Sequence, residues 1–134
     1  MKTASSRLYI VLALLVSAAL ACGGSFSTAN ISNAYLTADP GSGSATTVFS
    51  QDQVFYCIVE LQNAPDDTVV KVIWTAVNIE GSEPNTYIYE NSLTTGDNTL
   101  TFELSNNGPW PVGTYKADIY LNDTLDRTLT LEVQ

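Results

Sequence analysis

Apolar and polar residues alternate along most of the chain from residue 31 onward. In one example Leu100, Phe102 and Leu104 fall on one side of an extended backbone, and polar residues fall on the other. Successive side chains of a β-strand point to opposite faces, so a period of two predicts strands that bury one face each. No stretch beyond residue 30 repeats its apolar residues at the 3.6-residue period of a helix. The pattern therefore predicts an all-β domain of antiparallel sheets.

The apolar segments recur about every ten residues and are separated by turn residues. Strands are predicted at residues 31–38, 46–49, 54–62, 69–79, 86–94, 98–105, 114–122 and 125–133. The residues Thr95-Gly96-Asp97 predict a compact hairpin, and Asn122-Asp123 predicts a tight turn before the last strand. Short strands at this spacing are typical of a β-sandwich, here with about seven to eight strands.

The first 21 residues have the composition of a secretory signal peptide. Lys2 and Arg7 precede an uncharged, mostly apolar run at residues 8–21. A bilayer-spanning helix takes roughly 20 apolar residues, whereas the apolar core of a signal peptide takes about 7–15. We therefore expect residues 1–21 to form a helical leader that is removed on export.

A cysteine follows directly after this run. The sequence ALAC at residues 19–22 resembles the lipobox of bacterial lipoproteins, although the commonest form has Leu where this chain has Ala19. The resemblance implies that the Cys22 thiol carries a diacylglyceryl group and anchors the chain in a bacterial membrane. Ordinary secretory cleavage, with Cys22 left as a free thiol, is the alternative. Residues 22–30 are small and polar and predict a flexible tether to a domain at residues 31–134.

The charge of the chain restricts its partners. The full chain has a net charge of −9, and removal of the leader takes away two of its five cations and none of its 14 acids, which leaves −11. Such a domain repels phosphate backbones, so nucleic acid is not expected as a partner. Nor can it adhere to anionic headgroups by charge, so the predicted membrane anchor is the lipid on Cys22 alone.

Three residues of the predicted strands match landmarks of a known fold. Cys57 lies in one strand, Trp74 lies 17 positions later in the next, and Tyr115 lies two residues before Ala117. These positions resemble the cysteine, the tryptophan and the tyrosine corner of immunoglobulin-like sandwiches. Because Ala117 stands where the second cysteine would be, the resemblance implies no central disulfide, as in fibronectin type III domains. Cys57 is then expected to be a small, inert, buried residue.

A longer segment also resembles immunoglobulin-like domains. Residues 107–123 resemble the penultimate-strand segment of small, largely uncharacterised bacterial lipoproteins with an immunoglobulin-like domain: a Trp-Pro pair, then Gly-x-Tyr, then an alternating strand that ends in a polar turn. The resemblance implies an extracytoplasmic module and specifies no ligand.

Catalytic and metal chemistry is poorly supported. The chain has no histidine, which removes Ser-His-Asp and Cys-His nucleophilic systems and histidine-bound zinc. The acids Asp39, Asp66, Asp67 and Asp123 are calcium ligands by type, but they lie in turns without calcium-loop spacing. We expect no enzyme activity, no metal and no cofactor.

One strand face is more apolar than solvent exposure requires. If Trp74 and its alternating neighbours face the core, Ile73, Thr75 and Val77 face outward, and Tyr120 lies beside them with Lys71, Lys116, Asp118 and Thr128. Sandwich domains commonly bind partners through such a face. The alternative is that these β-branched residues only reflect strand propensity.

Exposed aromatic residues offer a second type of site. Tyr87 and Tyr89 are predicted to share one strand face, and Trp110 lies between two prolines, where it could stack on a sugar or plug the end of the core. The sequence thus predicts a non-catalytic binding module, for another envelope protein or an envelope polymer. A sugar- or small-ligand-binding lipoprotein using these aromatics and a passive structural module are the alternatives.

Overall fold

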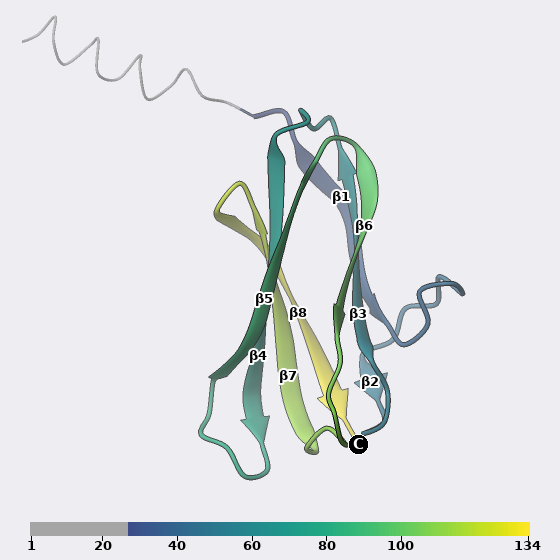
Figure 1. The fold of residues 1–134 in the computed structure, drawn as a ribbon, viewed down its shortest axis with the longest axis vertical. Coiled ribbons are helices and arrows are strands. Elements are labelled where there is room, and N and C mark those ends of the chain that lie inside the picture. Colours follow the sequence, from purple (N-terminus) through teal and green to yellow (C-terminus); the bar gives the residue numbers. More distant parts are fainter. Residues whose placement is uncertain (1–26) are drawn as a thin grey trace, which may run out of the picture.

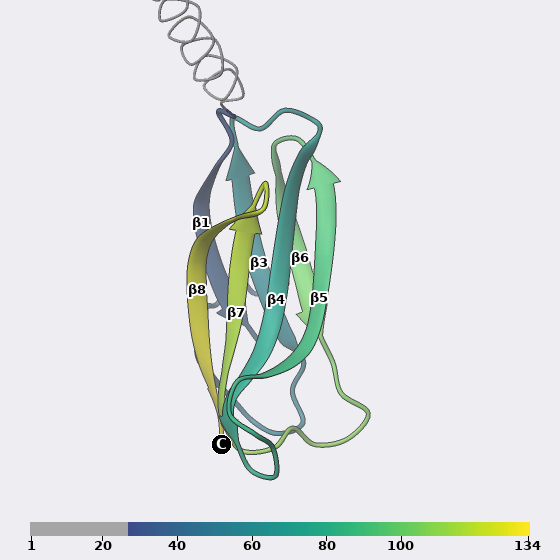
Figure 2. The same cartoon turned by 90° about the vertical axis from the view of Figure 1, so that its left-hand side faces the viewer.

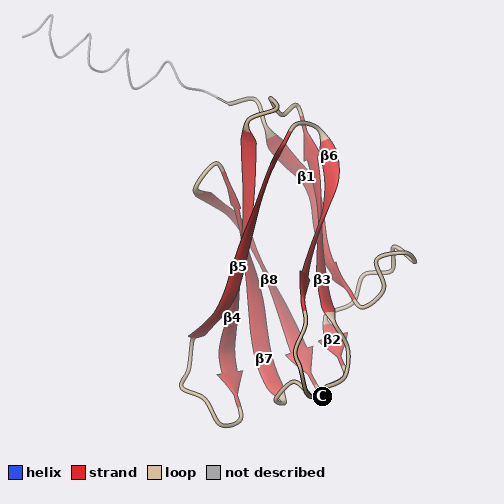
Figure 3. Ribbon diagram, viewed as in Figure 1, coloured by secondary structure: helices blue, strands red, loops and turns tan. Residues whose placement is uncertain are grey.

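The computed structural model describes residues 27–134, which form a two-layered sandwich of eight strands (Figures 1 and 3). The predicted leader, Cys22 and most of the predicted tether lie outside the described residues. The strands are β1 (Asn30–Thr37), β2 (Val48–Phe49), β3 (Phe55–Gln62), β4 (Thr68–Ile79), β5 (Thr86–Thr95), β6 (Asn98–Leu104), β7 (Gly113–Leu121) and β8 (Thr124–Val133). These bounds confirm the predicted all-β fold to within about two residues at each strand end.

The strands form a sheet of three in the order β1-β3-β6 and a sheet of five in the order β2-β8-β7-β4-β5. Figure 2 shows β8, β7, β4 and β5 in one layer with β1, β3 and β6 behind. Every ladder is antiparallel except that of the two-residue strand β2, which runs parallel to β8.

The predicted hairpin between the fifth and sixth segments is wrong. The turn at residues 95–97 is tight, but β5 pairs with β4 and β6 pairs with β3, so the turn crosses from one sheet to the other. The Asp97 carboxylate accepts a hydrogen bond of 2.6 Å from the Ala64 amide, which fixes the turn against the β3–β4 loop. The short connection thus joins the two layers instead of two neighbours in one sheet.

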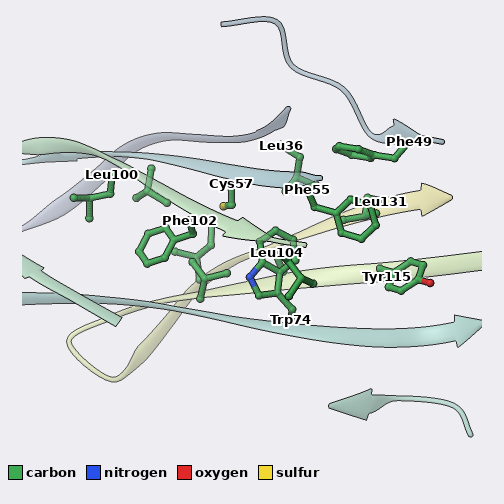
Figure 4. Packing of buried hydrophobic residues seen from close by; sticks show 14 of the residues in the cluster. Leu36, Phe49, Phe55, Cys57, Trp74, Leu100, Phe102, Leu104, Tyr115 and Leu131 are labelled. Carbon is green, nitrogen blue, oxygen red and sulfur yellow. The ribbon is translucent and has the colours of Figure 1, made fainter. Parts of the chain in front are cut away.

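The alternating residues meet between the two sheets (Figure 4). In β4, buried and half-buried residues alternate from Thr68 to Val77, and β6 buries Leu100, Phe102 and Leu104 as predicted. Fully burying one such apolar side chain contributes about 1.5–3 kcal/mol. The largest fully buried side chains come from both sheets: Trp74, Tyr115, Phe49, Phe55, Phe102, Ile119 and Leu131.

Two turn features set the ends of β7. Gly113 has a φ of 146° and lies so close to β4 that an added Cβ would come within 2.2 Å of the Asn78 carbonyl oxygen. At the other end Asn122 and Asp123 have φ values of 47° and 66°. Two successive positive φ values match the right-handed twist of a two-residue hairpin, so the predicted tight turn is confirmed.

The described chain begins at one end of the sandwich and finishes at the other (Figure 1). Within residues 27–134, no helix is long and apolar enough to cross a bilayer.

Candidate functional site

The predicted outward residues lie together on the outer face of the five-stranded sheet. In the β4–β7 ladder Lys71 pairs with Tyr120, Ile73 with Asp118 and Thr75 with Lys116. The adjacent β7–β8 ladder pairs Asp118 with Thr128. We call these residues, together with Val77, the outer face. Val77 lies at an irregularity of the β4–β7 ladder, and it is half-buried, as are Ile73, Thr75 and Tyr120.

The ionic groups of the outer face are satisfied within it. The Lys116 ammonium lies 3.2 Å from the Asp118 carboxylate, which also accepts a hydrogen bond from the Thr128 hydroxyl. The Lys71 ammonium lies 4.9 Å from the centre of the Tyr120 ring, a cation–π arrangement. A partner that covers this face therefore leaves few charged groups without a counterpart.

Two exposed apolar side chains flank the outer face. Tyr87, on β5, lies opposite Thr75 and is 57% exposed, and its hydroxyl lies 3.3 Å from the Glu90 carboxylate. Leu125, on β8, lies opposite Tyr120 and is 51% exposed. Partial desolvation and the neighbouring Glu90 carboxylate raise the pKa of Tyr87, so its hydroxyl remains a neutral donor. Ile73 lies between these two flanks.

The prediction that Tyr87 and Tyr89 share a strand face is wrong. Tyr89 pairs with Trp74 and Tyr87 pairs with Thr75, which leaves Ile88 as the extra residue of a β-bulge. One extra residue reverses the alternation. Tyr87 therefore lies on the outer face, and Tyr89, which is 48% exposed, lies on the side of β5 that faces the second sheet. Both are exposed, but they form no common stacking surface.

Trp110 plugs the end of the core and is unavailable to a sugar. It is only 6% exposed, and its ring stacks on Phe55 at a centroid distance of 4.6 Å and meets Tyr115 edge-on at 5.8 Å. Its indole N–H donates to the Gln53 carbonyl at 3.0 Å. A sugar could stack on this ring only if the end of the core opened, so the structure removes Trp110 from the candidate ligand aromatics.

The other landmark residues occupy their expected places. The Tyr115 hydroxyl donates to the Pro111 carbonyl at 2.6 Å, the hydrogen bond of a tyrosine corner. Cys57 is a fully buried free thiol, and Ala117 pairs with Trp74 across the β4–β7 ladder. Two buried side-chain polar atoms lack a hydrogen-bond partner within the described region, the Trp74 indole nitrogen and the Thr68 hydroxyl.

Burial of Cys57 and Tyr115 predicts a loss of stability at alkaline pH. Burial raises the pKa of Cys57 from 9.0 to about 12 and that of Tyr115 from 10.0 to about 12. The unfolded chain therefore releases these protons first. Below about pH 9 both groups stay protonated in the folded and the unfolded chain, so they should not change the free energy of unfolding. As the pH rises from about 9 to 12, the free energy of unfolding should fall. Thermal unfolding midpoints measured across this range test the prediction.

The variant Cys57→Ala separates the thiol from the other groups. Its midpoint should fall less steeply above pH 9, because only Tyr115 and the remaining surface groups still contribute. Native wild-type protein should also resist a thiol reagent that reacts readily once the chain is unfolded. Equal slopes in the two proteins would show that the thiol is not the group responsible.

The four acids that are calcium ligands by type do not come together among residues 27–134. No group of three His, Cys, Asp or Glu side chains there is placed to hold a metal ion. Asp39, one of the calcium candidates, accepts a hydrogen bond from the Gly41 amide in its own turn. A turn role accounts for that acid.

A groove that the sequence did not indicate lies between the two sheets at the β5–β6 side. It has a volume of about 460 Å³. The lining residues come from both strands and the loop that follows β6: Ile88, Tyr89, Asn91, Glu103, Leu104 and Ser105. Its presence depends on the unequal widths of the two sheets, which alternation along one strand does not reveal.

Comparisons with known proteins address the fold. No family model and no curated protein sequence matches the chain. Among solved structures, an immunoglobulin-like protein from Pseudomonas aeruginosa superposes with a TM-score of 0.52 at 12% identity, over 79% of this chain and 96% of that one. A Pseudomonas fluorescens alkylpurine DNA glycosylase bound to DNA gives 0.53 at 15% identity over 81% of this chain. A Listeria innocua β-glucosidase gives 0.51 at 15% identity over 79%.

The two enzymes are much longer than the matched region. This chain spans 31% of the glycosylase and 16% of the β-glucosidase, so these likenesses concern one β-sandwich portion of each enzyme. The immunoglobulin-like protein, by contrast, is matched over nearly its whole length. Together with the tyrosine corner and the two-sheet topology, these likenesses show that the chain has an immunoglobulin-like β-sandwich fold.

Proposed function

We propose that this protein is a membrane-anchored extracytoplasmic lipoprotein whose sandwich binds another envelope protein through the outer face, without catalysis. The observation that carries the proposal is the composition of that face. Its ionic groups are paired internally, whereas the exposed Tyr87 and Leu125 flank a half-buried Ile73. Aromatic and apolar residues with few unpaired charges are typical of the centre of a protein interface.

The anchor is a separate part of the proposal and depends on the sequence. The lipobox at residues 19–22 supplies the thiol for acylation, and residues 23–29 connect it to β1. Since the described chain begins at one end of the sandwich (Figure 1), a tether there would leave the outer face free along its length. Sugar binding has weaker support, because Trp110 is buried and the two tyrosines lie on opposite sides of β5.

Site-specific photo-cross-linking in the native host tests the binding face. A photoreactive phenylalanine derivative placed at Tyr87 or Thr128 should give a discrete protein adduct, because both positions lie on the outer face and are exposed. The matched positions Ser32 and Thr99 are also exposed but belong to the three-stranded sheet. They should give no adduct of that mass.

The double variant Tyr87→Ala/Leu125→Ala supplies the quantitative test. Loss of two exposed apolar contacts should lower the adduct yield from Thr128 by about thirtyfold, since each truncation at an interface costs roughly 1 kcal/mol. The fold should be unaffected because both side chains project into solvent. Adducts from both sheets in equal yield, or none from the outer face, would contradict the proposal.

A further inference from the structure

The four edge strands of the two sheets differ in how they are protected from pairing with another chain. Unpaired backbone groups on an edge strand can accept an additional strand, and proteins block this with short strands, bulges or covering segments. β2 has only two residues, and β5 is interrupted by the bulge at Ile88. The β2 edge is therefore too short for a regular ladder, and a regular ladder on β5 is limited to residues 89–95.

The β1 edge of the three-stranded sheet is blocked in three ways. Its ladder with β3 has a register shift between Ile31 and Asn33. The Arg127 guanidinium donates a hydrogen bond of 2.9 Å to the Ile31 carbonyl, and the Thr46 amide donates one of 2.8 Å to the Leu36 carbonyl. Acceptors on this strand are thus already in use.

The β6 edge has none of these protections. Its seven residues pair with β3 without a register shift, and they include no proline. No described strand lies on its other side within the sheet. β6 thus offers a regular row of backbone groups along its whole length.

The side of β5 that faces the three-stranded sheet is uncovered next to the β6 edge. On β4 the side chains of Val70 and Trp74 are 0% and 1% exposed, but their β5 partners Leu93 and Tyr89 are 36% and 48% exposed. The difference arises because the three-stranded sheet stops at β6 and leaves β5 without a facing strand. The groove of about 460 Å³ occupies this side.

The charge around the groove favours a basic occupant. Glu103 is the one charged residue among those that line the groove, and residues 86–104, which contain both strands, include no Lys or Arg. The three cations of the described chain lie on other strands, each within 4.0 Å of a carboxylate. A second copy of this acidic chain would add repulsion, whereas a basic segment would add attraction.

We propose that the free edge of β6 binds an extended, basic segment of a partner protein as a fourth strand of the three-stranded sheet. Backbone hydrogen bonds to β6 supply the pairing, and alternate apolar side chains of the segment fill the groove against Ile88 and Tyr89. Lys or Arg side chains on its other face lie near Glu103. This site is distinct from the outer face, so each can fail its own test independently.

Peptide titration of the full lipidated chain in detergent micelles tests this inference. The probe is the acetylated and amidated peptide Lys-Val-Thr-Val-Thr-Val-Lys, which alternates apolar residues and ends in cations. Saturable binding should slow the hydrogen exchange of alternate β6 amides and leave the β1 amides unchanged. The same peptide with Glu in place of Lys should bind about fivefold more weakly or worse.

Two neighbouring positions on β5 provide matched variants. Asn91 pairs with Val72 on the groove side and Ser92 pairs with Lys71 on the outer side, and both are exposed. Asn91→Trp should fill the groove and weaken peptide binding by about tenfold or more, whereas Ser92→Trp should change it by less than about twofold. Glu103→Lys, at an exposed site, should weaken binding without filling the groove.

Three results would overturn the inference. They are no saturable binding at millimolar peptide, protection that appears on β1 or β5 instead of β6, and equal losses in the two tryptophan variants. None of them bears on the photo-cross-linking of the outer face.

Discussion

Replacing Trp110 with alanine is expected to destabilise the domain by about 3–5 kcal/mol, the range for truncating a buried aromatic residue. The Trp110 ring closes the end of the core against Phe55 and Tyr115. Its removal leaves a cavity and takes away the donor for the Gln53 carbonyl. A loss of this size is a large share of the stability of a typical domain. Urea unfolding followed by far-UV circular dichroism measures it.

Two further variants test whether the lost stability comes from the Trp110 ring at the end of the core. Trp110→Phe keeps an aromatic ring against Phe55 but removes the indole N–H, so it should lose less, about 1–3 kcal/mol. Val112→Ala, two residues along and 37% exposed, should stay within about 0.5 kcal/mol of wild type. If Trp110→Ala lost no more than Val112→Ala, the ring would not be part of the core.

Replacing Cys22 with serine is expected to abolish membrane association. If acyl chains on the thiol are the only anchor, a hydroxyl in that place receives none, and the domain's charge of −11 repels anionic headgroups. The wild-type protein should sediment with membranes and require detergent for release, and the variant should appear wholly in the soluble fraction. Mass spectrometry of the wild-type amino-terminal peptide should show a diacylglyceryl-modified Cys22.

A neighbouring substitution controls for general effects on export. Ser25→Ala alters the same predicted tether but leaves the thiol, so its product should remain in the membrane fraction. Wild-type protein found in the soluble fraction with an unmodified Cys22 would favour ordinary secretory cleavage. Retention of the Cys22→Ser protein in membranes would point to a different anchor.

The fold was predictable because alternation is a local property of each strand. The buried set Leu100, Phe102 and Leu104 is visible without knowledge of which strand lies opposite. The landmark residues Trp74 and Tyr115 then limit the arrangement of the strands to one type of sandwich. The tight turn at Asn122-Asp123 was likewise predictable, since those residue types tolerate positive φ.

The errors arose where the fold depends on pairing between strands. The bulge at Ile88 adds a residue without altering the apparent alternation of the sequence around Tyr87 and Tyr89, so their separation onto two sides could not be deduced. The turn at residues 95–97 has the composition of a hairpin, yet β6 pairs with β3 in the opposite sheet and buries its apolar residues there. The groove beside Asn91 exists because a five-stranded sheet packs on a three-stranded one. The number of strands in each sheet is set by the whole topology and cannot be read from one strand.

The parallel pairing of β2 with β8 has a mechanical consequence. The Glu132 amide donates to the Thr47 carbonyl at 2.8 Å, and the Gln134 amide donates to the Phe49 carbonyl at 2.9 Å. Because the described chain begins and finishes at opposite ends of the long axis (Figure 1), tension applied between its two ends would run along the strands. Such tension strains these two bonds together in shear and does not unzip them one after the other.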